Sequence, residues 1–356
     1  MLDFITKRTD SWVYLKNCGM PVFIYGMGDG ALKILKVMGE YNIPVAGFFA
    51  SDEFVRGHSF EGHLVHKLSE IEEQIDDFVI VLAFAAGYDS LIEKIYSIAE
   101  KHIVIAPEVP VFGGGLFTWE YCQAHAEEIQ AVYDLLSDDM SKRVFAECIN
   151  FKISGKISLL PPVTTPKSEV LENILDFSDR EIYMDLGAYD GDTAFEFADA
   201  VNNKFDRIYA VEPSGKNYKK LIKNLEQRGD ERIIPLNVAV WSEDTLIPFA
   251  ERAGRQASFV SSSENKKEAK SVDSILSGEP CTYIKMDVEG AEREAIKGME
   301  RTIKQYAPKI AMSLYHKTPD FFELPLLVHK LNPDYKLFIR HQPYIPAWET
   351  NLYATL

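Results

Sequence analysis

The stretch EIYMDLGAYDGDTAFEFADAVNNKFDRIYAVEP, residues 181–213, decides the fold. Its apolar residues 182–184 predict a short buried strand that ends at Asp185, and residues 207–211 predict a second strand that ends at Glu212. A carboxylate in that last position can accept both hydroxyls of a ribose. The two strands therefore predict one half of a Rossmann-like nucleotide-binding fold.

A glycine turn and a helix start lie between these strands. Gly187 and Gly191 allow the backbone to approach a ligand, and Asp192 or Thr193 caps a helix whose free N–H groups face it. The spacing D-x-G-x-x-x-G differs from the G-x-G-x-x-G of dinucleotide sites. The turn is also acidic at Asp190, and carboxylates suit a sulfonium and an α-amino group better than a pyrophosphate. The turn therefore favours S-adenosylmethionine.

Later segments continue the alternation of strands and helices. Residues 233–241 predict a third strand and the loop that usually contacts adenine. The segment KSVDSIL, residues 270–276, precedes YIKMDVEGAE, residues 283–292, which predicts a fourth strand that ends in acids and opens a helix. A fifth strand is expected at residues 309–315, directly before His316.

The order of these motifs resembles the FkbM family of S-adenosylmethionine-dependent methyltransferases. The resemblance covers roughly residues 181–356, and KMDVEGAE at its distance from DLGA is its most specific part. It implies a seven-stranded Rossmann-like sheet with one antiparallel strand, closed by strands at 335–340 and 350–355. The matching segments are MDLGAYDGDTA, YAVEPSGKNY, LNVAV, SVDSIL, YIKMDVEGAE and PKIAMSLYH.

The expected donor site follows from these motifs. Glu212 should hold the ribose, Asp185 and Gly187 should shape the methionine pocket, and Asn237 should lie beside adenine. The full set of expected cofactor-binding residues is Asp185, Gly187, Asp190, Gly191, Thr193, Glu212, Asn237 and Val238.

The expected catalytic residues are Asp287, Glu289 and His316. A hydroxyl needs a general base to attack near neutral pH, and ligands bind beyond the carboxyl ends of strands in open α/β sheets. Histidine titrates in the required range. A helix-capping role for Asp287 and a dipole-pairing role for Glu289 stay open. The three side chains could also bind Mg²⁺ or Mn²⁺, but we expect no metal.

The N-terminal part predicts a second, smaller Rossmann-like module. Strands are expected at 21–25, 45–49, 79–83 and 103–105. The glycines fit G26-x-G28-x-x-A31, with Asp52 in the place of a ribose-binding acid. This part is similar to the small N-terminal domains of some sugar-modifying enzymes. It is either a nucleotide-sugar site or a module for docking or for forming a homodimer.

We therefore expect an α/β protein in three parts. Residues 1–110 form the small Rossmann-like domain, residues 111–175 a helical linker, and residues 176–356 the methyltransferase domain. The glycines at 113–115 mark the start of the linker. Residues 250–270 are polar and serine-rich, which predicts a loop that could fold over the acceptor.

Composition narrows the partners and the compartment. The formal charge is 38 − 54 = −16, which argues against a nucleic-acid partner. The sequence has no apolar run long enough to span a bilayer, and the N-terminus lacks a signal pattern. The four cysteines form no C-x-x-C pair. We expect a cytoplasmic enzyme with a small-molecule or glycan acceptor.

The leading hypothesis is O-methylation of a sugar hydroxyl in a glycan, a nucleotide sugar or a glycosylated natural product. Two alternatives stay open. An NAD-dependent sugar-modifying oxidoreductase would use residues 26–52, but it needs a Tyr/Lys or His pair that the sequence does not indicate. A non-catalytic nucleotide-binding module would tolerate loss of Asp287 and His316.

Overall fold

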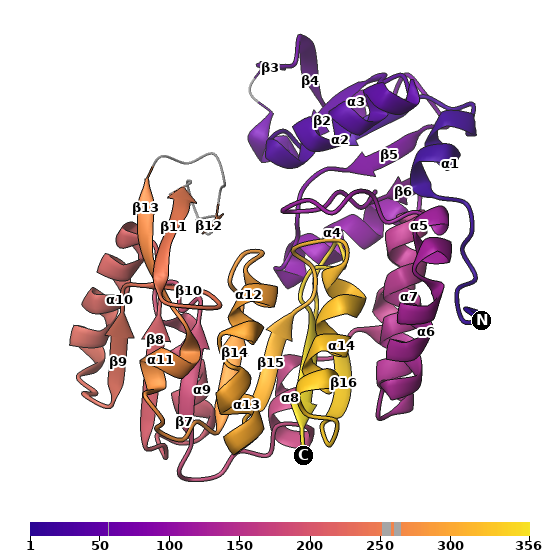
Figure 1. Ribbon diagram of the computed structural model, residues 1–356. Helices are drawn as coiled ribbons and strands as arrows, with labels where there is room; N and C mark the ends of the chain where they lie inside the picture. Colours follow the sequence, from indigo (N-terminus) through magenta and orange to yellow (C-terminus); the bar gives the residue numbers. More distant parts are fainter. Residues whose placement is uncertain (56, 251–257, 260–264) are drawn as a thin grey trace. The chain divides into compact units, whose positions relative to one another are not determined.

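The computed structural model describes residues 1–55, 57–250, 258–259 and 265–356 (Figure 1). The chain forms two compact units, both built from discontinuous segments. The first unit contains residues 1–133, 142–165 and 341–349, and the second contains residues 134–141, 166–340 and 350–356. The sequence predicted three continuous parts with boundaries at residues 110 and 175. The two units are discontinuous and so do not test that division, which stays a prediction.

The first unit is built on a six-stranded sheet in the order β3-β4-β2-β1-β5-β6. The central strand β1 (Val22–Tyr25) is buried along its length and pairs in parallel with β2 and β5. The four strands expected in this part are confirmed. The antiparallel pair β3–β4 was not expected. The other strands are β2 (Gly47–Ala50), β3 (Ser59–Phe60), β4 (His63–Lys67), β5 (Val79–Leu82) and β6 (Ile103–Ile105).

Helices follow the strands of this first sheet and continue into the middle of the chain. The core beneath them includes Ile24, Met38, Phe48 and Val79. Two 3₁₀ turns, at residues 157–159 and 161–163, follow the last of these helices. The helices are α1 (Ser11–Asn17), α2 (Asp29–Tyr41), η1 (Asp52–Phe54), α3 (Leu68–Glu72), α4 (Asp89–Ala99), α5 (Trp119–Ala124), α6 (Ala126–Leu135), α7 (Asp139–Ser154), η2 (Ile157–Leu159) and η3 (Pro161–Val163).

The second unit contains the expected seven-stranded sheet, in the order β16-β17-β15-β14-β7-β8-β9. Strand β17 runs antiparallel to β15, whereas β15, β14, β7, β8 and β9 pair in parallel. The carboxyl ends of these parallel strands therefore meet at one edge. The strands are β7 (Ile182–Leu186), β8 (Arg207–Val211), β9 (Ile233–Leu236), β14 (Tyr283–Met286), β15 (Lys309–Ser313), β16 (Lys336–His341) and β17 (Thr350–Thr355).

Aromatic side chains pack the helix that follows the glycine turn, α9, against the sheet. The ring of Tyr183 lies 4.5 Å from that of Tyr283 and 4.7 Å from that of Phe197, centroid to centroid. All three side chains are buried. The helices are α8 (Lys167–Asn173), α9 (Asp192–Ala200), α10 (Gly215–Arg228), α11 (Val272–Leu276), α12 (Glu292–Lys297), α13 (Glu300–Tyr306) and α14 (Asp320–Leu331).

A small separate sheet, in the order β10-β13-β11-β12, follows β9 in the chain. It corrects the loop expected over residues 250–270, because residues 258–259 and 266–270 are strands. The rest of that expected loop, residues 251–257 and 260–264, lies outside the described residues. The strands are β10 (Ala239–Val240), β11 (Thr245–Ala250), β12 (Ser258–Phe259) and β13 (Lys266–Lys270).

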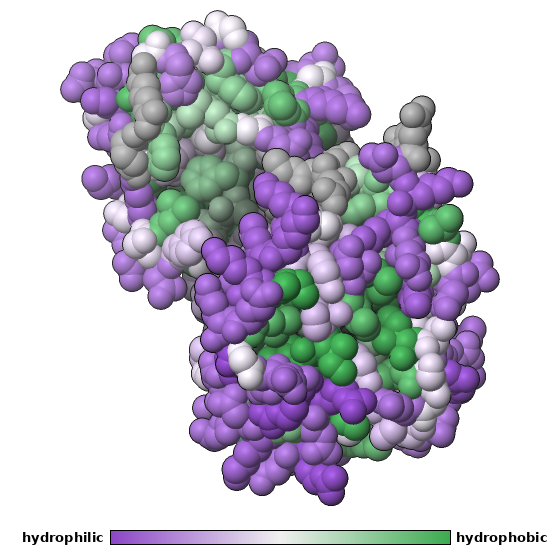
Figure 2. Space-filling view, turned by 90° about the vertical axis from the view of Figure 1, so that its left-hand side faces the viewer, coloured by the Kyte–Doolittle hydropathy of each residue, from purple (hydrophilic) through white to green (hydrophobic). Residues whose placement is uncertain are grey.

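The surface is mostly hydrophilic, in keeping with the high charge. Figure 2 shows hydrophobic residues gathered in patches between hydrophilic ones on the face in view. Phe54, Tyr88 and Leu246 are among the large apolar side chains that are exposed. Across the described ranges, none of the helices combines the length and the apolar character that crossing a bilayer requires.

Candidate functional site

The turn after β7 is held tightly against the neighbouring strands. Gly187 has a φ of +87°, and a Cβ atom there would lie 1.9 Å from the backbone oxygen of Asp287. The N–H groups of Gly187 and Ala188 both donate to the backbone oxygen of Val211, at 2.9 and 3.0 Å. The turn therefore needs glycine because two strand ends close in on its backbone.

This turn forms one wall of a pocket that encloses about 830 Å³ of space free of protein atoms, open solvent included. Ile247 and Phe249 of β11 form an apolar wall, which the sequence did not predict. The lining residues are Gly187, Tyr189, Asp192, Thr193, Val211, Glu212, Pro213, Asn217, Ala239, Val240, Ile247, Phe249, Lys285, Asp287, Val288, Glu289 and Ala291.

Glu212 is a buried acid at the end of β8, with 5% of its surface exposed. Its carboxylate accepts backbone hydrogen bonds from Tyr189, at 2.9 Å, and from Ser214, at 2.8 Å. Burial raises the pKa of Glu212 to about 7, although these two hydrogen bonds oppose the shift. Each carboxylate oxygen can accept a second bond, so the group can still receive ribose hydroxyls.

Asp185 lies behind the turn, fully buried at the end of β7. One oxygen accepts a hydrogen bond from the Thr193 hydroxyl at 2.5 Å, and the other lies 3.2 Å from Nζ of Lys285. Nζ of Lys285 also donates to the backbone oxygen of Gly187 at 3.0 Å. Burial opposes the charge of Lys285, but Asp185 and Asp287 together raise its pKa. The sequence did not predict a role for Lys285, a cation inside an otherwise apolar strand.

The other expected donor residues lie outside the pocket lining. Asn237 donates to the backbone oxygen of Glu212 at 2.8 Å and accepts from Nζ of Lys267 at 2.7 Å. It thus supports the backbone behind Glu212, while the small side chains that follow Val238 line the pocket. Asp190 contributes its backbone oxygen to a bond from Asn224 at 2.9 Å. Gly191, with a φ of +96°, caps α9. Their contacts with a donor stay predictions.

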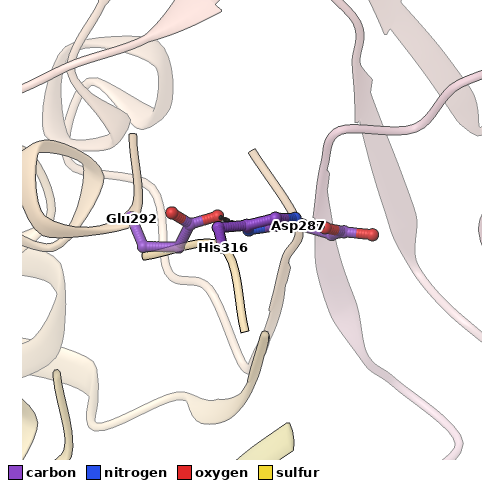
Figure 3. A group of neighbouring side chains, drawn as sticks. All are labelled: Asp287, Glu292 and His316. Atoms are coloured by element: carbon purple, nitrogen blue, oxygen red, sulfur yellow. Dashed lines mark hydrogen bonds and ion pairs between the residues drawn. The ribbon is translucent and has the colours of Figure 1, made fainter. Parts of the chain in front are cut away.

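The expected catalytic residues Asp287 and Glu289 both lie beside the imidazole of His316, and Figure 3 shows this ring with Asp287 and Glu292. Its Nε2 atom lies 3.3 Å from Asp287 Oδ1 and 3.6 Å from Glu289 Oε2. Its Nδ1 atom lies 2.7 Å from Oε1 of Glu292, which also accepts from the N–H of Val288. Glu292 belongs to the KMDVEGAE segment, but the sequence did not predict this contact.

Burial and charge act in opposite directions on His316. The side chain is almost fully enclosed, which lowers the pKa, but Glu292, Asp287 and Glu289 more than compensate and raise the pKa to about 10. His316 therefore carries its proton at neutral pH. An imidazolium between carboxylates can donate hydrogen bonds to them, but it cannot accept a further proton while it is charged.

Ligand atoms of Asp287, Glu292 and His316 lie within 4.8 Å of one another, close enough to consider a metal. However, Glu292 contacts Nδ1 and Asp287 contacts Nε2, so the two carboxylates flank the ring (Figure 3). A metal ligand set converges on one point, and each histidine supplies one nitrogen to it. This arrangement fits a protonated histidine better, and the absence of a metal stays a prediction.

Glu289 is the acid best suited to exchange a proton with a ligand. Its side chain is 22% exposed and lines the pocket. Burial raises the pKa of Glu289 to about 7; His316 opposes this shift, whereas Asp287 and Glu292 add to it. At neutral pH a large fraction of Glu289 is therefore deprotonated and able to accept a proton.

Comparison with known proteins finds a family match that includes the turn and the acids described above. Residues 185–346 match the model of the methyltransferase FkbM domain. No curated protein matches the chain. The fold is similar to the crystal structure of methyltransferase FkbM from Methylobacillus flagellatus KT, with a TM-score of 0.72 and 21% identity. That match covers 99% of this chain and 92% of the other, so the fold likeness includes both units.

Two more distant structures share part of the fold. Precorrin-6y C5,15-methyltransferase from Geobacter metallireducens GS-15 has a TM-score of 0.34 and 12% identity, over 51% of this chain and 82% of its own. SMU.1697c from Streptococcus mutans, in complex with SAH, has a TM-score of 0.34 and 11% identity, over 54% and 99%. Such low scores carry no functional argument. The match to the methyltransferase FkbM domain covers residues 185–346, and the fold of the chain agrees with that of the FkbM structure from Methylobacillus flagellatus KT.

Proposed function

We propose that the protein uses S-adenosylmethionine to methylate a hydroxyl of a sugar in a glycan, a nucleotide sugar or a glycosylated natural product. One observation carries the proposal. Glu212, Gly187 and Glu289 line the same pocket, so a ribose acceptor, the glycine turn and a proton acceptor face one space.

The charge of the pocket supports a sulfonium donor over a dinucleotide. Carboxylates of Asp192, Glu212, Asp287 and Glu289 line it. A dinucleotide would bring a pyrophosphate beside these acids, whereas S-adenosylmethionine brings a sulfonium and an ammonium. In our proposal Glu212 accepts the ribose hydroxyls, and the apolar wall of Ile247 and Phe249 packs against the adenine.

The acids beyond β14 would serve the acceptor. S-adenosylmethionine supplies an activated methyl group, so the protein must align the acceptor hydroxyl and take its proton. In our proposal Glu289 accepts that proton and Asp287 orients the hydroxyl. His316 holds both carboxylates in place through Nε2, and Glu292 fixes the ring from its other edge.

The sugar class of the acceptor rests on the N-terminal module, which is similar to domains of sugar-modifying enzymes. This module would dock or bind the sugar-bearing substrate or nucleotide sugar. Oxygen as the acceptor atom is supported by the pocket's proton acceptor, because a hydroxyl must lose a proton as the O–CH₃ bond forms.

Titration calorimetry tests the donor. We expect S-adenosylhomocysteine and S-adenosylmethionine to bind at micromolar or lower concentrations, and NAD to show no heat of binding. The affinity should be unchanged in Glu300→Gln, an exposed acid on α13 that serves as the control. Binding of NAD in place of S-adenosylhomocysteine would overturn the proposal.

Transfer of labelled methyl groups to a panel of sugars tests the reaction. Glu289→Gln keeps the side-chain shape, so donor affinity should hold while turnover falls about 10²- to 10⁴-fold. The wild-type rate should rise with pH through about 7, where Glu289 loses its proton, and this rise should vanish in the variant. A bound donor with no methylated sugar would favour the non-catalytic module.

A further inference from the structure

The pocket pairs several acids with a single cation. Among the described residues that line it, Lys285 is the only basic one, against four carboxylates. S-adenosylmethionine carries a sulfonium, an α-ammonium and an α-carboxylate. The acids suit the two cationic groups, but they repel the carboxylate, which needs a positive partner to leave water.

Lys285 is built into the sheet at the point where such a partner is needed. It lies on β14 directly beside Asp185 of β7, in the register of the parallel pair. Its Nζ atom contacts Asp185 at 3.2 Å and the backbone oxygen of Gly187 at 3.0 Å. The ammonium therefore sits under the glycine turn, held from behind by two fixed oxygens.

The hydrogen-bonding capacity of Lys285 is not exhausted by these two contacts. An ammonium group has three N–H donors. One donates to the backbone oxygen of Gly187, and the contact with Asp185 is an ion pair at 3.2 Å, because Asp185 Oδ1 has no hydrogen-bond partner among the described residues. The side chain is 16% exposed and lines the pocket, so Lys285 has donor capacity left for a ligand there.

We propose that Lys285 binds the α-carboxylate of the donor's methionine part and so selects ligands that carry it. This inference rests on the proposed use of S-adenosylmethionine. The competing view is structural: Lys285 would only neutralise the buried Asp185. The two views differ in one respect, because a structural role affects all adenosyl ligands alike, whereas a carboxylate contact affects only those with a carboxylate.

Calorimetry with three ligands separates them. S-adenosylhomocysteine has the carboxylate, its decarboxylated analogue keeps the ammonium but lacks the carboxylate, and methylthioadenosine lacks both. The wild type should bind S-adenosylhomocysteine about 10- to 100-fold more tightly than the decarboxylated analogue, the range expected for a hydrogen bond between charged groups. In Lys285→Met this ratio should fall close to one, while the affinity for methylthioadenosine stays within about threefold, the usual context-dependence of one contact.

Two further variants control for unfolding and for the loss of a positive charge. Removing Lys285 alone leaves Asp185 buried without its ion pair, which can unfold the turn. The double variant Asp185→Asn, Lys285→Met removes both charges and should give the same collapse of the ratio. Lys223→Met removes one positive charge from an exposed position on α10 and should leave the ratio as in the wild type.

The outcomes are distinct. A wild-type ratio near one, or a ratio that survives in both Lys285 variants, overturns the inference while leaving the methyltransferase proposal intact. If the wild type binds none of the three ligands, the proposed donor itself is wrong.

Discussion

The two units use the same local design for different ends. In each, a buried strand at the centre of a parallel sheet runs into a glycine turn and a helix. In the first unit, a Cβ atom on Gly26 would lie 2.6 Å from the ring of Phe84, and one on Gly30 would lie 2.3 Å from the backbone oxygen of Ala83. Close packing within the unit accounts for these glycines, as it does for Gly187 in the second unit.

The two units differ in the environment of the acid that follows the second strand. Asp52 of the first unit is exposed, whereas Glu212 of the second is buried and held by two backbone N–H groups. In the second unit this acid shares a pocket with the glycine turn. A glycine pattern thus reports a close approach of backbones, and a ligand site requires suitable groups around the same space.

The largest expected contrast is between Gly187 and Gly30. In Gly187→Ala the new Cβ meets a backbone oxygen at 1.9 Å with φ at +87°, so we expect destabilisation of roughly 2–5 kcal/mol. Donor binding should be lost. Gly30→Ala also meets a backbone oxygen and should destabilise the first unit while leaving donor affinity unchanged. Hydrogen exchange localises each effect, and calorimetry measures the affinity; equal loss of donor binding in both would erase the contrast.

A smaller contrast is expected between the two strand-end acids. Glu212→Ala removes the proposed ribose partner and leaves the N–H groups of Tyr189 and Ser214 without their acceptor, so S-adenosylhomocysteine should bind about 30- to 150-fold more weakly. Asp52→Ala should leave that affinity unchanged. The matched pair is measured by the same titration. A strong effect of Asp52→Ala would mean that the first unit contributes to the donor site.

A third contrast concerns two buried histidines with opposite pKa shifts. His316, with a pKa raised from 6.5 to about 10, stabilises the fold below pH 6.5, and this stabilisation is lost as the pH rises through 10. His341 of the first unit has a pKa lowered to about 4, chiefly by burial. Its neutral form is favoured above pH 6.5, and that stability is lost as the pH falls through 4.

Denaturant unfolding of the wild type, His316→Gln and His341→Gln from pH 4 to pH 10 checks both signs. The difference between wild type and His316→Gln should shrink toward alkaline pH, and the difference for His341→Gln should shrink toward acidic pH. Each effect should be on the order of a few kcal/mol. A pH-independent difference for either variant would show that its histidine does not titrate in this way.

The strands and the glycine turn of the second unit were predictable because their signals are local. Apolar runs that end in Asp185 and Glu212 fix the strands, and Gly187 marks the turn. Lys285 and Glu292 could not be assigned, because their partners lie 100 and 24 residues away in sequence and only strand register and helix packing bring them together. The role of a charged side chain on an apolar strand can be assigned only when its partner in space is known.

The small sheet shows a different limit. Strand β13 is the polar run KKEAK, which reads as a loop because polar strands lack apolar alternation. It is a strand because β11 and β10 pair with its two edges. Strand pairing depends on a neighbour that the segment's own sequence does not reveal. The contribution of Ile247 and Phe249 to the pocket was therefore not predicted.

The chain passes from the second unit into the first at residues 341–349 and then returns to the second. This segment interrupts the last strands of the second unit but belongs to the first, where Ile345 exchanges backbone hydrogen bonds with Ala86 at 2.7 and 2.9 Å. A shortened protein that begins near residue 176 would retain this segment without its mate. Ile345 and Ala347, which are buried in the whole chain, would then be exposed to water. A single truncation therefore cannot separate the two units cleanly.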